Sequence, residues 1–296
     1  TLAAGTRRIE LGKTTRIMGI VNVTPDSFSD GGRFYSTDGA VAQALKLVRD
    51  GADIVDVGGE STRPFSDPVD EEEEIRRVVP VVRALAERID IPISIDTNKA
   101  GVARAAIAAG ATILNDVGAL RLDPDMAAVA AESGVAVIVM HMLGTPKTMQ
   151  KSPAYEDLFG EIRQFLADAI HRATDGGVPR SQIVVDPGIG FGKTVVHNLK
   201  LIAGLGRLRD LDAPILVGPS RKAFIRNLLK GPREADIPAD RPVVETGTQA
   251  AAAAAVLAGA HILRVHDAAA MAATVRILDA VRSAAAPDRD ADSAPA

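Results

Sequence analysis

The sequence alternates between short apolar runs and segments with helical spacing, and it does so eight times. The apolar runs, rich in Val, Ile and Leu, cover residues 16–23, 53–57, 91–95, 112–114, 135–140, 182–185, 214–217 and 261–265. Helical spacing follows over residues 40–49, 70–88, 99–109, 124–132, 155–174 and 198–208, then up to 229, across the alanine run to 257, and on to about 282. Short apolar runs separated by helices are typical of parallel strands that are buried on both faces.

Eight βα units without a linker predict one α/β domain, a single (β/α)8 TIM barrel. A doubly wound open sheet would usually have fewer units and a glycine fingerprint after the first strand, which this sequence lacks. We expect the barrel to span residues 16–282, after an N-terminal extension over 1–15. Residues 283–296 contain mostly Ala, Asp, Pro and Ser without a period, and we expect a disordered tail there.

Composition excludes several classes of function. A net charge of -4, a pI near 5.8 and the lack of a basic run argue against a nucleic-acid partner. No apolar run approaches the roughly 18 residues of a membrane span, so no membrane partner is expected. The chain has no cysteine, which excludes disulfides, thiolate metal sites and a cysteine nucleophile, and fits a cytoplasmic location.

Each apolar run is followed by polar or charged residues, and in a barrel these strand ends meet at the face where active sites lie. In chain order they are Asn22, Glu60 with Thr62 and Arg63, Asp96, Asn115, His141, Asp186, Ser220 with Lys222, and Arg264 with His266. Ser61 and Asp116 fit equally well as caps of the following helix. Lys, Arg and His are poor N-caps, so capping does not explain the whole set.

Four strand-end residues could together bind the edge of a flat heterocycle. Asp96 and Asp186 offer carboxylates, Asn115 an amide and Lys222 an ammonium group. Carboxylates accept paired N–H donors, and an amide both donates and accepts, so the set suits an amino-oxo ring. The alternative is a structural ion-pair network in the mouth of the barrel.

A second group of residues suits phosphates. Arg63, Arg264 and His266 are cationic or can become so, and a helix begins after Ser220. Asn22 belongs beside them and offers a neutral oxygen, which could hold Mg²⁺ together with a diphosphate and water. The polar loop over residues 24–32 is either a solvated connector or a mobile lid over this site.

The segments that carry these residues are 19–32, 56–64, 94–97, 115–116, 139–142, 186–194, 220–222 and 264–267. Each is a weak signal alone. Together, in this order and at all eight strand ends, they resemble the dihydropteroate synthases, over roughly residues 16–282.

The resemblance implies a transferase that joins p-aminobenzoate to 6-hydroxymethyl-7,8-dihydropterin diphosphate in folate biosynthesis, giving 7,8-dihydropteroate and diphosphate. It implies pterin contacts from Asp96, Asn115, Met140, Asp186, Lys222 and Arg264. It implies diphosphate contacts from Asn22, Arg63, Arg264 and His266, with Asn22 as a ligand of the Mg²⁺ cofactor. It implies p-aminobenzoate contacts from Phe28, Thr62, Pro64, Phe191, Ser220 and Lys222. The family is a sulfonamide target and typically a homodimer, for which the Ala-rich helices over 248–257 and 268–281 offer small-residue faces.

An SN1-like path through a pterin-methyl cation fits this chemistry, because the pterin ring can delocalise positive charge. Asp30, Asp96 and Asp186 are the candidates for negative charge near the cation, and Lys222 is expected where both substrates meet. One residue departs from the family pattern: Phe65 stands where Gly usually follows Thr-Arg-Pro, so the path of the second loop is open.

Three other functions fit the sequence less well. A methyltransferase acting on methyltetrahydrofolate would use a similar pterin-binding barrel but has no need of the first loop or of residues 220–222. A metal-dependent hydrolase needs clustered histidines, and His171 and His197 fall on or beside helices instead. A paralogue without turnover would be expected to lose Lys222, Arg63 or the first loop, and the sequence retains all three.

Overall fold

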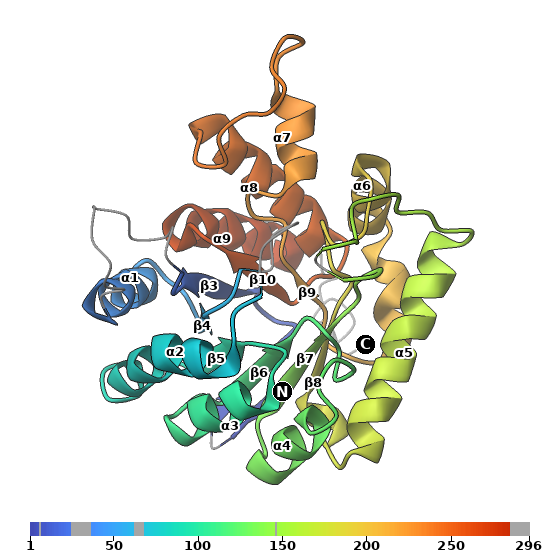
Figure 1. The fold of residues 1–296 in the computed structure, drawn as a ribbon. Helices are drawn as coiled ribbons and strands as arrows, with labels where there is room; N and C mark the ends of the chain where they lie inside the picture. Colours follow the sequence, from blue (N-terminus) through green and yellow to red (C-terminus); the bar gives the residue numbers. More distant parts are fainter. Residues whose placement is uncertain (6, 25–36, 62–67, 146, 285–296) are drawn as a thin grey trace, which may run out of the picture.

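The computed structural model describes residues 1–5, 7–24, 37–61, 68–145 and 147–284, and these form a barrel of parallel strands surrounded by helices (Figure 1). The barrel strands are β3 (Arg16–Asn22), β4 (Ile54–Gly58), β5 (Ile93–Asp96), β6 (Ile113–Asp116), β7 (Ala136–Met140), β8 (Ile183–Asp186), β9 (Leu216–Val217) and β10 (Ile262–Val265). They pair in the order β8-β7-β6-β5-β4-β3-β10-β9, and a parallel bridge between Val185 and Ile215 joins the two ends. The predicted (β/α)8 barrel is therefore confirmed.

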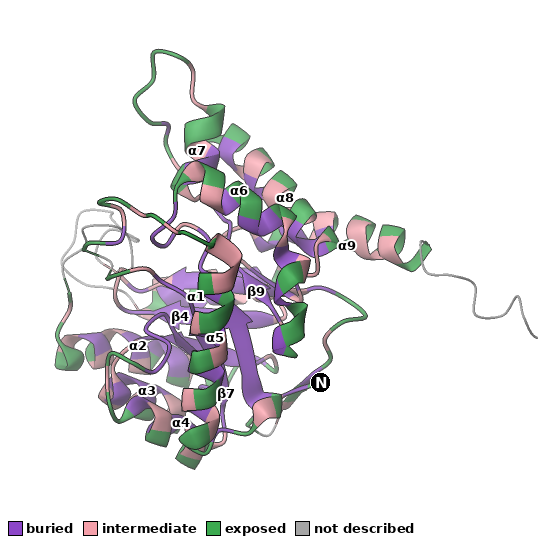
Figure 2. Ribbon diagram, turned by 90° about the vertical axis from the view of Figure 1, so that its right-hand side faces the viewer, coloured by how far each residue is buried: buried purple, intermediate pink, exposed green. Residues whose placement is uncertain are grey.

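The strands divide their side chains between two cores, because successive residues of a strand point to opposite faces. In β4, Ile54 belongs to a cluster inside the barrel, whereas Val55 and Val57 belong to the larger cluster between strands and helices. Figure 2 shows the strands buried and the helices exposed on their outer faces. This alternation turns Asp56 toward the barrel interior together with Ile54.

The α-helices among the described residues are α1 (Thr37–Arg49), α2 (Glu71–Ala86), α3 (Ala100–Ala108), α4 (Met126–Ser133), α5 (Leu158–Asp175), α6 (Val195–Ala203), α7 (Ala223–Leu229), α8 (Pro242–Leu257) and α9 (Ala268–Ala284). Helix α2 is capped by Asp70, whose carboxylate accepts from the Glu73 N–H at 2.7 Å. Its first turn is entirely acidic, which suits the positive end of the helix dipole. No helix in the described ranges has both the length and the apolarity to cross a membrane.

One helix expected from the sequence is two elements. The segment 198–208 was predicted as a single helix, but α6 ends at Ala203 and a 3-10 helix, η3 (Leu205–Leu211), follows. The break occurs at Gly204, where a Cβ atom would collide with the ring of Phe159. The close packing of that ring against the backbone is a tertiary effect, which the helical spacing of the sequence does not record. A further short 3-10 helix, η2 (Arg180–Gln182), precedes β8.

The N-terminal residues form a hairpin that was not predicted, because they show no strand pattern. Strands β1 (Leu2–Ala4) and β2 (Arg7–Ile9) pair antiparallel, with Leu2 opposite Ile9. Leu2, Ala4 and Ile9 are buried in the same cluster as Ile54 and the other apolar residues inside the barrel. The hairpin therefore covers the end of the barrel opposite the active-site mouth. It shields the interior core from water at that end.

Candidate active site

Parallel pairing places the predicted strand-end residues at the same end of the barrel, which forms its mouth. The paired positions are Asn22 with Gly58, Gly58 with Asp96, Asp96 with Asn115, and Met140 with Asp186. Asp96, Asn115 and Asp186 are buried, whereas Asn22 and Arg264 are partly exposed. The strands thus bring together three of the four residues that were predicted to bind a flat ring, and the fourth, Lys222, lies close enough to Asp186 to lower its pKa.

Arg264 joins two carboxylates at the mouth. Its Nε atom donates to Asp56 Oδ2 at 2.6 Å, and one of its terminal nitrogens donates to Asp96 Oδ2 at 2.7 Å. The amide nitrogen of Asn115 donates to the same oxygen of Asp56 at 3.2 Å. Asp56 is completely buried, and sequence reasoning gave it no role although it lies in a quoted motif. The available signal was a charged residue inside an otherwise apolar strand.

Burial and charge act in opposite directions on these groups. Burial raises the pKa of Asp96 to about 7, against the lowering effect of Arg264. Burial likewise raises the pKa of Asp186 to about 6, while the N–H of Gly188, which donates to its Oδ1 at 2.7 Å, lowers it. Burial disfavours the charged guanidinium of Arg264, but Asp56 and Asp96 hold its pKa above the ordinary value. Arg264 therefore stays charged, whereas burial moves the pKa values of Asp96 and Asp186 upward, toward neutral pH.

Lys222 reaches the mouth from the start of α7. Its Nζ atom lies 3.9 Å from the centroid of the Phe191 ring, a cation–π contact between two residues predicted to touch p-aminobenzoate. Gly190 makes room for this arrangement: it has a φ of 85°, and a Cβ there would come within 2.9 Å of Lys222 Cδ. Phe191 also packs with Met140 in a small buried cluster.

Ser220 and His266 are hydrogen-bonded to each other across β9 and β10. The Oγ atom of Ser220 lies 2.9 Å from His266 Nδ1, and the backbone N–H of His266 donates to the same Oγ at 3.3 Å. A residue predicted to contact p-aminobenzoate thus contacts a residue predicted to bind diphosphate. The two predicted subsites are adjacent at this point.

His141 lies at its predicted strand end but contacts a residue that sequence reasoning overlooked. The buried Lys193 Nζ lies 2.9 Å from His141 Nδ1 and donates to the carbonyl of Phe191 at 2.9 Å. Burial lowers the pKa of Lys193 to about 7, and burial together with Lys193 lowers the pKa of His141 well below its usual range. His141 is therefore neutral and accepts through Nδ1, and this bond fixes the segment 188–193 against β7.

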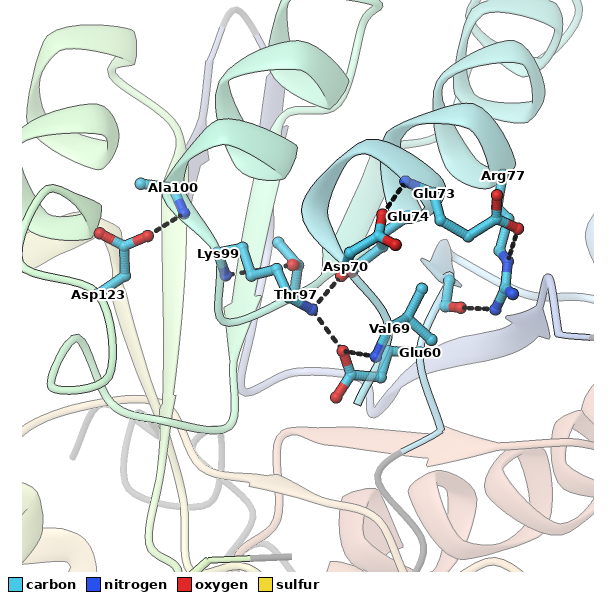
Figure 3. Close-up of polar contacts among 11 residues, drawn as sticks. Glu60, Val69, Asp70, Glu73, Glu74, Arg77, Thr97, Lys99, Ala100 and Asp123 are labelled. Carbon is cyan, nitrogen blue, oxygen red and sulfur yellow. Dashed lines mark hydrogen bonds and ion pairs between the residues drawn. The ribbon is translucent and has the colours of Figure 1, made fainter. Parts of the chain in front are cut away.

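Two other strand-end residues serve the chain locally. Asp116 accepts the backbone N–H groups of Gly118 and Leu120 at 2.6 and 2.7 Å, which stabilises a turn well before α4 begins. Glu60 is ion-paired with Lys99, toward which its side chain points in Figure 3. The expectation that Asp116 caps the following helix is therefore wrong, and both residues have local structural roles instead.

Lys99 is the centre of a second group of charges, beside helix α2 (Figure 3). It is ion-paired with Glu60, and its Nζ lies 2.6 Å from an oxygen of Glu74, whose side chain is 1% exposed. Burial raises the pKa of Glu74, against the hydrogen bond from Lys99. Glu60 also accepts the backbone N–H of Val69 at 3.3 Å, so the group links both ends of the segment 60–69.

Several predicted site residues lie outside the described residues. They are Phe28, Asp30, Thr62, Arg63, Pro64 and Phe65. The choice between a connector and a lid for residues 24–32, and the effect of Phe65, therefore stay predictions.

Comparison with known proteins gives a consistent result. The family model described as "Pterin binding enzyme" matches residues 18–266. The dihydropteroate synthase of Synechocystis sp. is 46% identical over 280 residues, covering 95% of this chain and 94% of the relative. That of Escherichia coli K12 is 44% identical over 269 residues, covering 90% and 92%.

Solved structures agree. A crystal structure of Yersinia pestis dihydropteroate synthase with a sulfonamide drug has 42% sequence identity and a TM-score of 0.88, covering 96% of this chain and 99% of that one. The Xanthomonas albilineans enzyme in complex with 7,8-dihydropteroate has 42% identity and a TM-score of 0.81, covering 93% and 95%.

The chain therefore belongs to the pterin-binding enzymes, and among them to the dihydropteroate synthase family. The family resemblance inferred from the eight sequence segments is confirmed.

Proposed function

We propose that this chain is a transferase that joins p-aminobenzoate to 6-hydroxymethyl-7,8-dihydropterin diphosphate and releases 7,8-dihydropteroate and diphosphate, as a step of folate biosynthesis. The observation that carries the proposal is the group of donors and acceptors at the mouth, Asp96, Asn115, Asp186 and Arg264, in a member of this family. Related enzymes have been solved with 4-aminobenzoic acid and with 7,8-dihydropteroate, which supports small-molecule substrates of this kind.

The pterin ring would lie over the mouth, bound along its edge by Asp96, Asn115 and Asp186. Carboxylates in a water-poor site form strong bonds to the N–H groups of a flat ring, and these bonds discriminate against rings without such donors. Arg264 would stack on the ring, since two carboxylates fix the orientation of its planar guanidinium group. Met140, buried against Phe191, provides an apolar contact.

The second substrate and the leaving group would occupy the other side of the mouth. Phe191, Ser220 and Lys222 form the described part of the proposed p-aminobenzoate subsite, to which Phe28, Thr62 and Pro64 are also assigned. Asn22, His266 and Arg264, with Arg63, form the proposed diphosphate subsite. The hydrogen bond between Ser220 and His266 supports the proximity of the two subsites that a transfer reaction needs.

The reaction breaks the bond between the pterin methylene carbon and the diphosphate oxygen, and forms a bond from that carbon to the amine nitrogen, which gives up a proton. We propose an SN1-like order, in which the cation forms before the amine attacks. Asp96 and Asp186, and Asp30, would place negative charge near the cation. Exclusion of water is needed because water would otherwise trap the cation.

Asn22 fits the proposed Mg²⁺ site, at the partly exposed end of β3 beside Gly58, which has no side chain to obstruct an ion. No group of three or more His, Asp or Glu side chains suited to a metal occurs among the described residues. An ion here would thus take one oxygen from Asn22 and the others from diphosphate and water, a set that Mg²⁺ accepts. It would neutralise charge that develops on the leaving diphosphate.

We also propose a cytoplasmic homodimer. Helices α8 and α9 pack side by side and carry the exposed apolar residues Leu257, Ile277 and Val281, which are 59%, 66% and 54% exposed. Apolar side chains exposed in this way are typical of surfaces that another chain covers. Light scattering should give twice the chain mass, and Ile277→Glu should shift it toward the monomer; a wild-type mass of one chain would contradict the dimer.

The activity is tested by measuring diphosphate release with each component omitted in turn. We expect release only when pterin diphosphate, p-aminobenzoate and Mg²⁺ are all present, in equal amounts with dihydropteroate. Release at the same rate without p-aminobenzoate would indicate a hydrolase, and pterin binding without release would indicate a binding protein. Either result would overturn the proposal.

A further inference from the structure

Asp56 is a carboxylate inside the barrel for which the proposed reaction has no direct use. It lies in the middle of β4, between Val55 and Val57, and is completely buried. Burying a charged group costs free energy unless close partners compensate for it. The partners of Asp56 therefore show what the residue stabilises.

Both partners of Asp56 belong to the proposed pterin subsite. Its Oδ2 atom accepts from Arg264 Nε at 2.6 Å and from Asn115 Nδ2 at 3.2 Å. Asp56 is one pleat below Gly58, which pairs with Asp96 at the level of the mouth. The carboxylate thus contacts the two pocket residues from beneath, and the ring would lie on their other side.

The contact with Asn115 fixes the orientation of an amide. A carboxylate can only accept hydrogen bonds, so the NH₂ group of Asn115 must face Asp56 and its Oδ1 atom must face away. Without this constraint, the two ends of an amide are nearly interchangeable in shape. The contact therefore decides that Asn115 presents its oxygen as an acceptor.

The contact with Arg264 fixes the orientation of the guanidinium plane. Nε bonds Asp56 and a terminal nitrogen bonds Asp96, so two anchors on one edge prevent the guanidinium from rotating about its last bonds. A planar group held along one edge leaves its face available for stacking.

We propose that Asp56 is a positioning residue for the pterin ring. It fixes the orientation of the guanidinium plane of Arg264, and it turns the amide of Asn115 so that the oxygen is presented as the acceptor. This inference rests on the proposed function, because it assumes that Arg264 and Asn115 contact the pterin. Asp56 itself does not touch the ring. It acts through the two residues above it.

The test uses Asp56→Asn, which keeps the shape but removes the charge and introduces a donor. The new amide competes with the donors of Arg264 and Asn115, so both should lose their fixed orientation. We expect the affinity for 6-hydroxymethylpterin, measured by calorimetry on the full chain, to fall at least about tenfold. The KM for pterin diphosphate should rise more than the KM for p-aminobenzoate, a split that general loosening of the barrel would not produce.

The matched control is Ser94→Ala. Ser94 pairs with Asp56 on the neighbouring strand, and its buried hydroxyl has no hydrogen-bond partner among the described residues. This variant alters the same layer of the barrel without touching Arg264 or Asn115, so pterin affinity should stay within about twofold. An equal loss in both variants would show that the layer, and not Asp56, determines the effect, and would overturn the proposal.

A double-mutant cycle with Asn115→Ala tests whether Asp56 acts through Asn115. If it does, the factor lost to Asp56→Asn should shrink at least about threefold when Asn115 is already Ala. If the loss of pterin affinity in the double variant equals the product of the two single losses, this part of the proposal is overturned. Asp56→Ser serves the same assays if Asp56→Asn does not fold, and failure of both to fold would show a role in folding instead of positioning.

The results separate this inference from the proposed function. If the wild-type chain binds no pterin, the proposed function itself fails. If the wild-type binds pterin and Asn115→Ala weakens binding, but Asp56→Asn leaves it within about twofold, only the role of Asp56 is overturned.

Discussion

Two cations in this molecule each bind two carboxylates, in regions that serve different purposes. They are Arg264 with Asp56 and Asp96 in the barrel mouth, and Lys99 with Glu60 and Glu74 beside helix α2. Both groups contain one cation and two acids, and both include a carboxylate that is almost completely buried. The difference lies in what their remaining polar atoms do.

The polar atoms of the group around Lys99 bind other parts of the chain. Glu60 accepts the N–H of Val69, and the backbone N–H of Lys99 donates to Thr97 Oγ1 at 3.3 Å. Glu74 is supplied by α2, so the group holds a helix, a strand end and a loop together. Lysine suits this task because its compact ammonium can bond several acceptors in different directions.

The group around Arg264 leaves surface for a ligand. The arginine side chain is 19% exposed at the mouth, and its planar group is bound along one edge only. Two similar groups of charges can therefore serve either the structure of the chain or the binding of a substrate. The difference is whether the cation leaves a surface exposed at the mouth. Substitutions in the two regions test this distinction.

The largest effect is expected from removing the other cation of the mouth. Lys222→Ala should reduce turnover by about 10³-fold or more, because its Nζ lies where both substrates are proposed to meet. The melting temperature should change by less than about 4 °C, since Lys222 packs at a partly exposed helix start. Steady-state kinetics and thermal melting check this. A variant that unfolds well below the parent would show that Lys222 is structural.

Lys99→Met should give the reverse result. It leaves Glu74 buried without its cation, so we expect a loss of about 2–3 kcal/mol in the free energy of unfolding, with pterin affinity unchanged within about twofold. Urea unfolding and calorimetry measure the two quantities. The control is Arg104→Met, whose partner Glu132 is largely exposed and whose loss should cost less than about 0.5 kcal/mol. A Lys99 variant that lost pterin affinity but kept its stability would remove the distinction between the regions.

The sequence predicted the barrel because its signal is local. Each strand is a short apolar run and each helix has its own spacing, so the eight units could be counted without knowing any contact. The short hairpin over residues 2–9 was missed because three-residue strands show no usable period. The break at Gly204 was missed because it depends on Phe159, which is distant in sequence.

The site was predictable where strand ends carry it and not where side chains meet inside the barrel. Asp96, Asn115 and Asp186 were found because the fold rule brings strand ends together. Asp56 and Lys193 were missed because their importance lies in partners, Arg264 and His141, that only the three-dimensional structure reveals. Glu60 shows the opposite error, since its strand-end position suggested a place in the active site, whereas its side chain binds Lys99 and the backbone of Val69.

A smaller effect is expected from Asp186→Asn. The carboxylate would be replaced by a group that cannot accept all the hydrogen bonds from the pterin edge, so pterin affinity should fall by ten- to a hundredfold, about 1.4–2.7 kcal/mol. The fold should persist, because the new amide can still accept the N–H of Gly188. Calorimetry measures the affinity. A value unchanged within about twofold would remove Asp186 from the pterin subsite.

The last effect concerns the pH dependence of stability. The pKa of Asp96 is raised to about 7 in the folded chain, whereas an unfolded Asp titrates near about 4. Between these values the folded state binds the extra proton, so the free energy of unfolding should decrease as pH rises through this window, and level off above it. One such group contributes less than about 1.4 kcal/mol per pH unit. Asp96→Asn should therefore flatten the curve between about pH 4 and 7, measured by urea unfolding.

The same measurement on Glu74→Gln compares the two regions directly. Burial raises the pKa of Glu74 as well, so its contribution has the same sign, but the hydrogen bond from Lys99 opposes the shift. We therefore expect Glu74→Gln to flatten the curve less than Asp96→Asn does. If Glu74→Gln flattened the curve more, ionising the buried carboxyl beside α2 would cost more free energy than ionising Asp96. The mouth would then not be the region where buried charge lowers stability most.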